Sequence, residues 1–294
     1  MTNPKVSIVI VNYNTGELLK NCLDSISSNL SYSSYEIIVV DNNSADGSRE
    51  MLSVYPGIKP IFNGQNLGFG RANNRGIKIA RGDYVLLLNS DTIVLPKSID
   101  QVVNYLDNNP SVGVLGPRLV GKDRKIKQMS WVFLPSFFWE FVQKIFSPKN
   151  IKLSLVRVIV DLIQRKEREV PSVAGASMFI RRKVFEEAGF LDENLFLYFE
   201  EPDFCLRVKK KGWKVVFYPA AEIIHLLGET MVKTGGITQL YYRQSQIYYY
   251  KKHHSLFEQW LLKQYLLLKF KILLFARNSD GEIERKIVET IRKW

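Results

Sequence analysis

Four clusters of polar residues have side chains of the types that bind ligands or transfer protons. Three of them directly follow short apolar runs: Asn12-Tyr13-Asn14, Asp41-Asn42-Asn43 and Asn89-Ser90-Asp91. The fourth, Glu200-Glu201-Pro202-Asp203, places three carboxylates within four residues. Amide and carboxylate oxygens can accept hydrogen bonds from a base or a ribose, and a carboxylate can hold Mg²⁺ or Mn²⁺ that bridges a diphosphate. These residue types predict a nucleotide site, and an enzyme is the leading interpretation.

The apolar runs before the first three clusters predict the strands that position them. Residues 6–11, 37–40 and 84–88 are short and apolar, which is typical of strands buried on both faces of a sheet. Strand and helix patterns alternate over residues 1–95, so we expect a parallel sheet with right-handed crossovers. Ligands of open α/β sheets bind beyond the carboxyl ends of the strands, and the three polar clusters should therefore meet at one site.

Each cluster also has a purely structural explanation. Asp91 could cap the turn that follows its strand, and Asp41 could be an ordinary turn residue. Neighbouring carboxylates in a cleft raise one pKa, which suits Glu200, Glu201 or Asp203 to general-base work. The same three acids also begin a predicted helix, where the helix dipole favours negative charge. Local sequence leaves both explanations open.

A second predicted helix, over about residues 71–80, follows a glycine-rich turn. Asn66, Gly68, Arg71 and Asn73 lie at its start. Glycine permits close approach of the backbone to a ligand, and a helix start favours phosphate. The alternative is a tight turn into a core helix, and the G-x-G-x-x-G dinucleotide fingerprint is absent.

The three histidines have different predicted places. His225 follows an apolar pair and could complete a metal site as a neutral imidazole, or it could be a hydrogen-bonded core histidine. His253 and His254 follow two lysines, so we expect them to be basic surface residues.

Composition restricts the partners and the compartment. The 294 residues carry a formal net charge of +12, which favours an anionic partner such as a nucleotide, a nucleic acid or a membrane leaflet, or else a solvated basic surface. The two cysteines, Cys22 and Cys205, fit reduced core thiols of a cytoplasmic protein. We expect no signal peptide, because a strand begins by residue 6, and no apolar run is as long as a bilayer span.

Two segments break the regular alternation. Residues 129–163 mix seven tryptophans and phenylalanines with lysine and proline, and residues 256–277 are rich in leucine and phenylalanine with interspersed lysines. Basic residues beside apolar ones favour a helix that lies at the interface of an anionic lipid membrane, or a segment that binds an apolar acceptor. The alternative is that the two segments pack on each other or across a homodimer.

Four stretches carry a resemblance to a known family. They lie at residues 6–14; 40–44 with 46–48; 66–76 with 82–92; and 190–193 with 197–207. In this order and spacing the chain, over roughly residues 5–250, resembles the family 2 inverting glycosyltransferases of the GT-A fold, particularly their bacterial rhamnosyltransferase-like branch.

The resemblance implies the fold class and the division of the chain. It implies an α/β fold with a GT-A type, Rossmann-like, mostly parallel sheet flanked by helices, and a C-terminal helical appendage. The catalytic domain would span residues 1–228, with a nucleotide-binding half at 1–95 and an acceptor half at 96–228. Residues 229–294 would form a basic, aromatic helical tail that associates with a membrane or a second subunit.

The resemblance also implies roles for individual residues. Asp91 takes the place of the metal ligand in the family's D-x-D motif, with His225, in His-x-x-Gly-x-Thr, contacting the metal or the diphosphate. Glu201 takes the place of the catalytic base, where the family usually has Asp, and Asp203 is the alternative base. Asp192 and Glu200 would contact the acceptor. The expected nucleotide-binding residues are Asn12, Asn14, Asp41, Asn43, Asn66, Gly68, Arg71, Asn73 and Asn89.

The implied activity is transfer of a sugar from a nucleoside-diphosphate sugar, with Mg²⁺ or Mn²⁺ as cofactor. dTDP-rhamnose is the favoured donor and UDP-hexoses come next. The acceptor would be a glycan or a lipid-linked saccharide in cell-surface polysaccharide synthesis, and the enzyme would be cytoplasmic or peripheral on the inner face of the plasma membrane. The alternative is an inactive nucleotide- or glycan-binding protein on the same fold. A nucleic-acid partner is disfavoured, because buried strands that end in acids do not make a groove for a phosphate backbone.

Overall fold

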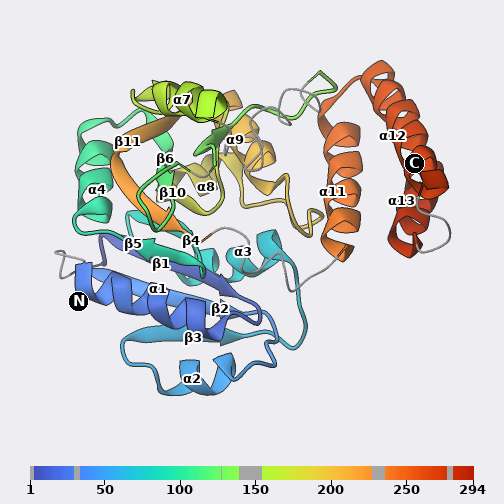
Figure 1. Cartoon of the computed structure of the whole chain (residues 1–294). Coiled ribbons are helices and arrows are strands. Elements are labelled where there is room, and N and C mark those ends of the chain that lie inside the picture. Colours follow the sequence, from blue (N-terminus) through green and yellow to red (C-terminus); the bar gives the residue numbers. More distant parts are fainter. Residues whose placement is uncertain (1–2, 30–33, 127, 139–153, 227–235, 277–280) are drawn as a thin grey trace.

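The computed structural model describes residues 3–29, 34–126, 128–138, 154–226, 236–276 and 281–294. Over these residues the chain forms an α/β body around one nine-stranded sheet, with three helices at the C-terminal end (Figure 1).

The first four strands of the sheet are parallel and adjacent. Their order in the sheet is β3-β2-β1-β4. They span β1 (Val6–Asn12), β2 (Tyr35–Asp41), β3 (Ile58–Phe62) and β4 (Tyr84–Asn89). The helices α1 (Gly16–Asn29), α2 (Ser48–Val54) and α3 (Phe69–Ile79) connect them. In the register, Asn12 lies opposite Asp41 and Val11 lies opposite Asn89, so the carboxyl ends of β1, β2 and β4 line up.

The second half of the sheet is mixed. β10 runs antiparallel to both β4 and β6, while β11 runs parallel to β6 and carries β5 and β8 as antiparallel neighbours. These strands are β5 (Thr92–Val94), β6 (Val112–Val120), β8 (Arg168–Glu169), β10 (Ser177–Arg181) and β11 (Lys214–His225). Six of the nine strands therefore point one way, which confirms the predicted mostly parallel α/β sheet.

The long strand β11 is irregular in the middle. The apolar patterns at residues 213–218 and 221–225 predict two separate segments, but they form one strand with a register shift between Tyr218 and Glu222. After the shift, the strand stays paired with β6 on one side and pairs with the short edge strand β5 on the other. His225 is thereby placed opposite Thr92, next to Asp91.

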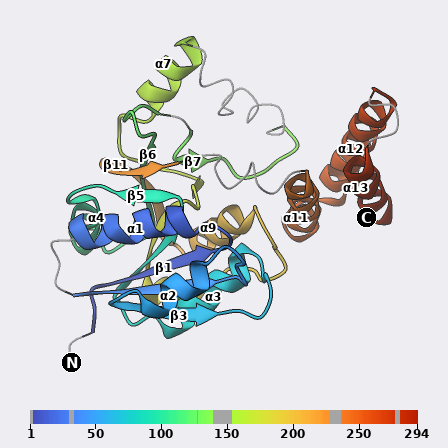
Figure 2. The same ribbon diagram turned by 60° about the horizontal axis from the view of Figure 1, so that its bottom comes forward.

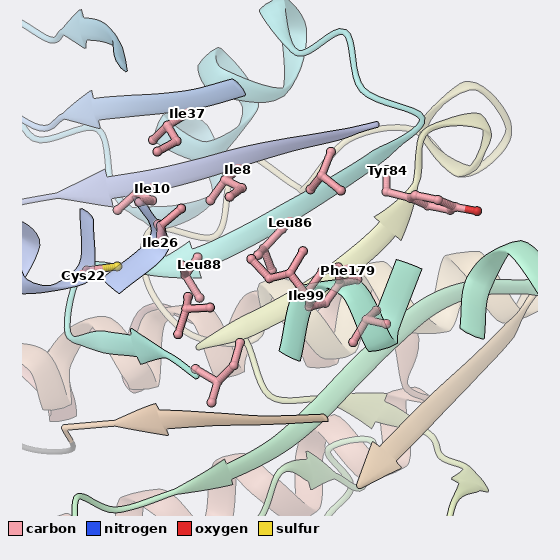
Figure 3. Packing of buried hydrophobic residues seen from close by; sticks show 14 of the residues in the cluster. Ile8, Ile10, Cys22, Ile26, Ile37, Tyr84, Leu86, Leu88, Ile99 and Phe179 are labelled. Carbon is pink, nitrogen blue, oxygen red and sulfur yellow. The ribbon is translucent and has the colours of Figure 1, made fainter. Parts of the chain in front are cut away.

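Helices cover both faces of the sheet. α1 and α4 (Ser98–Asn108) cover one face, where Ile8 and Ile10 pack with Leu86, Leu88 and Phe179 (Figure 3). α3, α8 (Arg182–Ala188) and α9 (Glu200–Lys210) cover the other face, built on the alternate strand residues such as Val9 and Leu87. Cys22 and Cys205 are buried free thiols in these two cores, as predicted.

The aromatic segment around residues 129–163 contains regular structure at both ends. β7 (Trp131–Val132) pairs with β9 (Ser172–Val173) in a small antiparallel sheet, and α7 (Ser154–Ile163) is a helix. The middle of the segment, residues 139–153, lies outside the described residues.

The C-terminal helices pack around a core of their own. They are α11 (Ile237–His253), α12 (Leu256–Ala276) and α13 (Glu282–Lys293). Figures 1 and 2 both show α11 between the α/β body and the α12–α13 pair. Leu195 and Phe199 of the body belong to the same hydrophobic cluster as α11, so this helix is packed on the acceptor half, and the domain boundary near residue 228 stays a prediction. Within the described residues, no helix has the length and apolarity to cross a membrane.

Candidate active site

The three polar clusters at the strand ends meet, as predicted. A chain of side-chain hydrogen bonds joins them: Asn12 Nδ2 donates to Ser44 Oγ at 2.9 Å, and Thr15 Oγ1 donates to Asn12 Oδ1 at 2.7 Å. The Thr15 and Ser90 hydroxyls are 2.8 Å apart. One continuous network thus links the turns after β1, β2 and β4.

Asp41 is fully buried at the end of β2 and shapes the turn that follows. Both of its carboxylate oxygens accept from the backbone N–H of Ser44, at 3.1 and 3.0 Å. Asn14, in a left-handed conformation, supports the same turn by accepting from the Ala45 N–H at 2.8 Å. Asn43 is also left-handed and accepts from Arg49 Nη1 at 3.0 Å.

The turn before α3 is held by Asn42, a member of the second polar cluster that was not among the expected nucleotide-binding residues. Asn42 donates to both the Asn66 side-chain oxygen and the Gly68 carbonyl, each at 3.1 Å. Gly68 has φ +80°, and a Cβ there would lie 2.3 Å from the carbonyl oxygen of Phe196. Glycine is therefore required here by a close approach of the acceptor half.

The start of α3 contacts that acceptor half through its polar side chains. Arg71 pairs with Glu193 at 3.3 Å. Asn73 is buried and donates to a carbonyl one turn earlier in its own helix at 3.0 Å. Asn74, which was not predicted, exchanges hydrogen bonds of 2.8 and 3.1 Å with the backbone of Leu191. These contacts fix the two halves together, and the nucleotide roles of Arg71 and Asn73 stay predictions.

Asp91 and His225 lie side by side, as the metal hypothesis requires. His225 Nε2 is 3.2 Å from Asp91 Oδ1, and the two side chains are 11% and 9% exposed. The other ring nitrogen, Nδ1, is 2.9 Å from Gln128 Nε2, a partner that the sequence did not suggest. Residues 227–230, which complete the His-x-x-Gly-x-Thr motif, lie outside the described residues.

The donor set of this pair fits a divalent cation that takes few protein ligands. One carboxylate and one imidazole are suitable ligands for Mn²⁺, and a diphosphate and water would supply the remaining positions. Across the described part of the chain there is no group of three or more His, Cys, Asp and Glu side chains that could hold a metal alone. Asp91 and His225 are thus the residues whose chemistry fits the predicted metal, and the metal role of this pair stays a prediction.

The turn that carries the acidic cluster has an unusual backbone. Tyr198 and Phe199 are consecutive left-handed residues, with φ of 69° and 72°, directly before α9. Each such residue costs about 1–3 kcal/mol, so the surroundings must hold the turn in place. α11 does this, because Ser245 Oγ donates to the Leu197 carbonyl at 2.9 Å and the Phe199 ring lies 5.0 Å from the Tyr242 ring.

Glu201 and Glu200 both have raised pKa values. The Glu201 residue is partly exposed, but its carboxyl group is buried, and this burial raises its pKa. Hydrogen bonds from its own N–H and from the Gly175 N–H lower the pKa, but by less than burial raises it. Burial, together with the charge of Glu201, raises the pKa of Glu200 well above its usual range. Glu200 Oε1 has no hydrogen-bond partner among the described residues. The sequence left the sign of the Glu201 shift open, and the structure gives it as upward.

Asp203 has the opposite electrostatic environment. Its fully buried carboxylate lies 2.9 Å from Arg207 Nε, 2.6 Å from Lys252 Nζ and 2.7 Å from His253 Nε2. Burial alone would raise the pKa of Asp203, but the Lys252 hydrogen bond and the nearby cations outweigh it and lower that pKa. The expectation that His253 is a surface residue was wrong: its side chain is 7% exposed, because it is needed to pair a buried carboxylate.

Lys252 also binds Asp192, the predicted acceptor residue. Its Nζ lies 2.6 Å from Asp192 Oδ2, to which the Tyr248 hydroxyl donates at 3.0 Å. Burial raises the pKa of Asp192, yet the hydrogen bonds from Lys252 and Asn194 outweigh it and lower that pKa to about 2. Ser245, Tyr248 and Lys252 are three and four residues apart, so they lie on one face of α11. This spacing is the sequence pattern from which a polar contact face on the helix could have been predicted.

The Asp91–His225 pair and the acidic cluster are joined through one turn. The Asn89 N–H, two residues before Asp91, donates to the Ala176 carbonyl at 3.0 Å. The preceding residue, Gly175, binds the Glu201 carboxylate, and a Cβ on Gly175 would lie 1.7 Å from Glu201 Oε1. Residues 174–176 therefore hold the end of β4 and the start of α9 next to each other.

Comparison with known families identifies the chain. Residues 7–189 match Glycosyl transferase family 2. The chain belongs to this family. It is 29% identical over 233 residues to an N-acetylglucosaminyl-diphospho-decaprenol L-rhamnosyltransferase of Mycobacterium tuberculosis, covering 74% of this chain and 75% of the relative. It is 26% identical over 239 residues to the dTDP-rhamnosyl transferase RfbF of Shigella flexneri, covering 80% and 73%.

Solved structures show the same fold. The mannosyltransferase PcManGT of Pyrobaculum calidifontis, in complex with GDP-Man and Mn²⁺, superimposes with a TM-score of 0.59 at 16% identity, covering 86% of this chain and 64% of that one. Residues 1–349 of S. aureus TarS, in complex with UDP, give a TM-score of 0.56 at 16% identity, covering 98% and 70%. The predicted GT-A fold is thereby confirmed, and the chain is a glycosyltransferase by family.

The space at Gly175 leads to a first prediction. Gly175→Ala should displace the Glu201 carboxylate and lower kcat by about 10²-fold, the loss that follows a misplacement of about 1 Å. Steady-state kinetics would measure this, with calorimetry to show that donor affinity is kept. Gly64→Ala is the matched control, because nothing lies within 4 Å of a Cβ there. Full activity of Gly175→Ala would show that the close approach does not position the carboxylate.

The Asp192–Lys252 pair leads to a pH prediction. Because the pKa of Asp192 is lowered from 3.8 to about 2, the charged carboxylate stabilises the folded state above about pH 4, and this contribution is lost as the pH falls towards 2. Asp192→Asn should therefore lower the melting temperature by a constant amount between pH 5 and 7, and by less at each step below pH 4.

A double-mutant cycle supplies the control for that pH series. In a Lys252→Gln background the Asp192→Asn effect should be smaller, because its main partner is gone. Equal effects in both backgrounds would show that the pair does not stabilise the fold.

Proposed function

We propose that this chain is an inverting, metal-dependent glycosyltransferase that moves a sugar from a nucleoside-diphosphate sugar to a glycan or lipid-linked saccharide in cell-surface polysaccharide synthesis. The observation that carries the proposal is the turn at residues 174–176. It sets the predicted base, Glu201, beside the strand end that leads to the predicted metal ligand, Asp91. A base and a diphosphate-binding group must lie on either side of the reacting sugar for a single displacement.

Glu201 is the proposed general base. Its raised pKa gives it more basicity than an ordinary carboxylate, and part of the residue is exposed. Asp203, the alternative, is fully buried with its oxygens bound to Arg207, Lys252 and His253, so it is a weak base without access. We assign Asp203 to holding α9 against α11.

The chemistry follows from this geometry. Glu201 removes the proton from an acceptor hydroxyl, and the oxygen attacks the anomeric carbon while the nucleoside diphosphate leaves from the opposite face, which inverts the configuration. Asp91 and His225 would hold Mn²⁺ or Mg²⁺, which when bound neutralises charge on the diphosphate. Burial and the charge of Glu201 raise the pKa of Glu200 well above its usual range, so Glu200 holds its proton more tightly than an ordinary carboxyl group and places less negative charge beside Glu201.

The nucleotide would lie over the joined turns after β1, β2 and β4. Asp41 acts there by fixing the turn that contains Asn43 and Ser44, since its own carboxylate is buried beneath that turn. dTDP-rhamnose is the favoured donor and UDP-hexoses come next, because relatives at 26% and 29% identity are described as rhamnosyl transferases. A lipid-linked acceptor is favoured by the decaprenol in the name of the M. tuberculosis relative.

The alternative function is an inactive nucleotide- or glycan-binding protein. It would explain Asn89 in place of an acid in the metal motif and Glu201 in place of Asp. Against it stand the Asp91–His225 pair and the raised pKa of Glu201, neither of which an inactive protein needs.

Replacing the base tests the mechanism. Glu201→Gln keeps the shape but cannot accept a proton, so it should lower the transfer rate by ~10²–10⁴ while donor affinity by calorimetry is unchanged. Glu201→Asp should retain part of the activity, because a shorter carboxylate remains. Asp203→Asn should chiefly lower the melting temperature, because it removes the charged partner of Arg207 and Lys252 and weakens the contact with His253. Transfer at the parent rate by Glu201→Gln would refute the assignment.

A donor panel tests the activity and its metal requirement together. Release of nucleoside diphosphate from dTDP-rhamnose, UDP-glucose, UDP-galactose and GDP-mannose is measured with Mn²⁺, with Mg²⁺ and with excess chelator. We expect turnover of dTDP-rhamnose only with metal, no metal stimulation in Asp91→Asn, and weaker stimulation in His225→Gln. The exposed Asp123→Asn is the control acid. Nucleotide binding without turnover of any donor would favour the inactive alternative.

A further inference from the structure

One face of α12 carries large apolar side chains that point into solvent. Phe257 is 66% exposed, Trp260 55%, Leu268 62% and Phe275 89%, with Ile272 at 58% beside them. At 100° per residue, positions 257, 260, 264, 268, 271 and 275 lie on one side of a helix, so these residues form a stripe along its length. We call residues 257, 260, 268, 272 and 275 the α12 stripe.

The opposite side of α12 is fully used in packing. Leu262, Leu266 and Phe270 are completely buried in the cluster that α11, α12 and α13 share. The helix is therefore anchored by one face, and the α12 stripe is left without a partner among the described residues. An exposed apolar strip of this length on a folded protein indicates an interaction surface.

The aromatic segment before residue 139 adjoins the same helix. The Phe137 ring packs edge-on against Tyr265, at 6.1 Å and 88°, and His254 Nε2 donates to the Pro135 carbonyl at 2.8 Å. The two unusual segments thus do pack on each other, as the alternative explanation held. That packing still leaves Phe138 72% exposed, in addition to the α12 stripe.

Charge indicates what the stripe binds. α12 carries Lys263, Lys269 and Lys271 against the single acid Glu258, and Lys271 is exposed on the striped side. A second copy of the chain would bring three lysines against three lysines with one glutamate each to offset them. An anionic lipid surface accepts both the apolar stripe and the positive charge.

We propose that α12 is an interfacial membrane-binding helix, with the α12 stripe inserted at the boundary between headgroups and acyl chains and its lysines facing anionic headgroups. The tryptophan and phenylalanines suit this depth, since aromatic rings favour the membrane interface. The helix lies in the surface and does not cross it, in keeping with the absence of a span-forming helix from the described residues.

Vesicle co-sedimentation tests the proposal on the full chain. The parent protein should bind phosphatidylcholine vesicles that contain 30% phosphatidylglycerol, more weakly at high salt and much more weakly on pure phosphatidylcholine. Leu268→Gln/Phe275→Gln changes no charge and should weaken binding by about 10-fold or more, because it removes two inserted side chains. Val54→Gln is the matched control, an 82% exposed apolar residue on α2, and should bind like the parent.

Charge variants, circular dichroism and light scattering complete the test. Lys263→Gln/Lys271→Gln should reduce binding to the anionic vesicles and flatten its salt dependence. Circular dichroism melting shows whether the variants fold, and the single Phe275→Gln replaces the double variant if they do not. Parent-like binding by the Gln variants would overturn the proposal. A second outcome would also overturn it: light scattering shows that the parent is a dimer and the Leu268→Gln/Phe275→Gln variant a monomer, and neither protein binds vesicles.

Discussion

The ammonium group of Lys252 lies 2.6 Å from two carboxylates, that of Asp192 in the loop before α9 and that of Asp203 in α9. Asp203 is fully buried, and a buried charge is tolerated only when it is paired. Lys252, with His253 and Arg207, meets that requirement, and both Lys252 and His253 are at the end of α11. The turn before α9, the loop that carries Asp192 and the C-terminal helices are therefore held together by one electrostatic cluster around the buried Asp203.

The same contact divides the acidic residues into two groups. Asp192 and Asp203 receive cations, and their pKa values are lowered. Glu200 and Glu201, a few residues away, receive none, and burial raises their pKa values. When the environments of neighbouring carboxylates shift their pKa values in opposite directions, the groups can take different roles in one site, some structural and some in acid–base chemistry. The division depends on how α11 docks, and so it is a property of the tertiary structure.

Local sequence patterns were sufficient for the sheet and for the meeting of its polar strand ends, because apolar runs and the residues that end them are short-range signals. The Asp91–His225 neighbourhood also followed from the family motif. What could not be foreseen depends on contacts between distant segments. The left-handed Tyr198 and Phe199 are not residues that favour such backbone, and they are held by α11. His253 sits beside lysines yet is buried, because Asp203, fifty residues earlier, needs it. The register shift within β11 depends on its pairing with β6, a strand about a hundred residues earlier in the chain.

The place of α11 in the chain also has a consequence for biosynthesis. A ribosome that has released only the sheet and α9 has made every proposed catalytic side chain, but not the helix that holds Tyr198 and Phe199 in their strained conformation. Asp203 would then be without Lys252 and His253, two of its three side-chain partners. The nascent body can therefore collapse around its sheet while the turn before α9 is still unformed, and that turn takes its final shape only after α11 has been made.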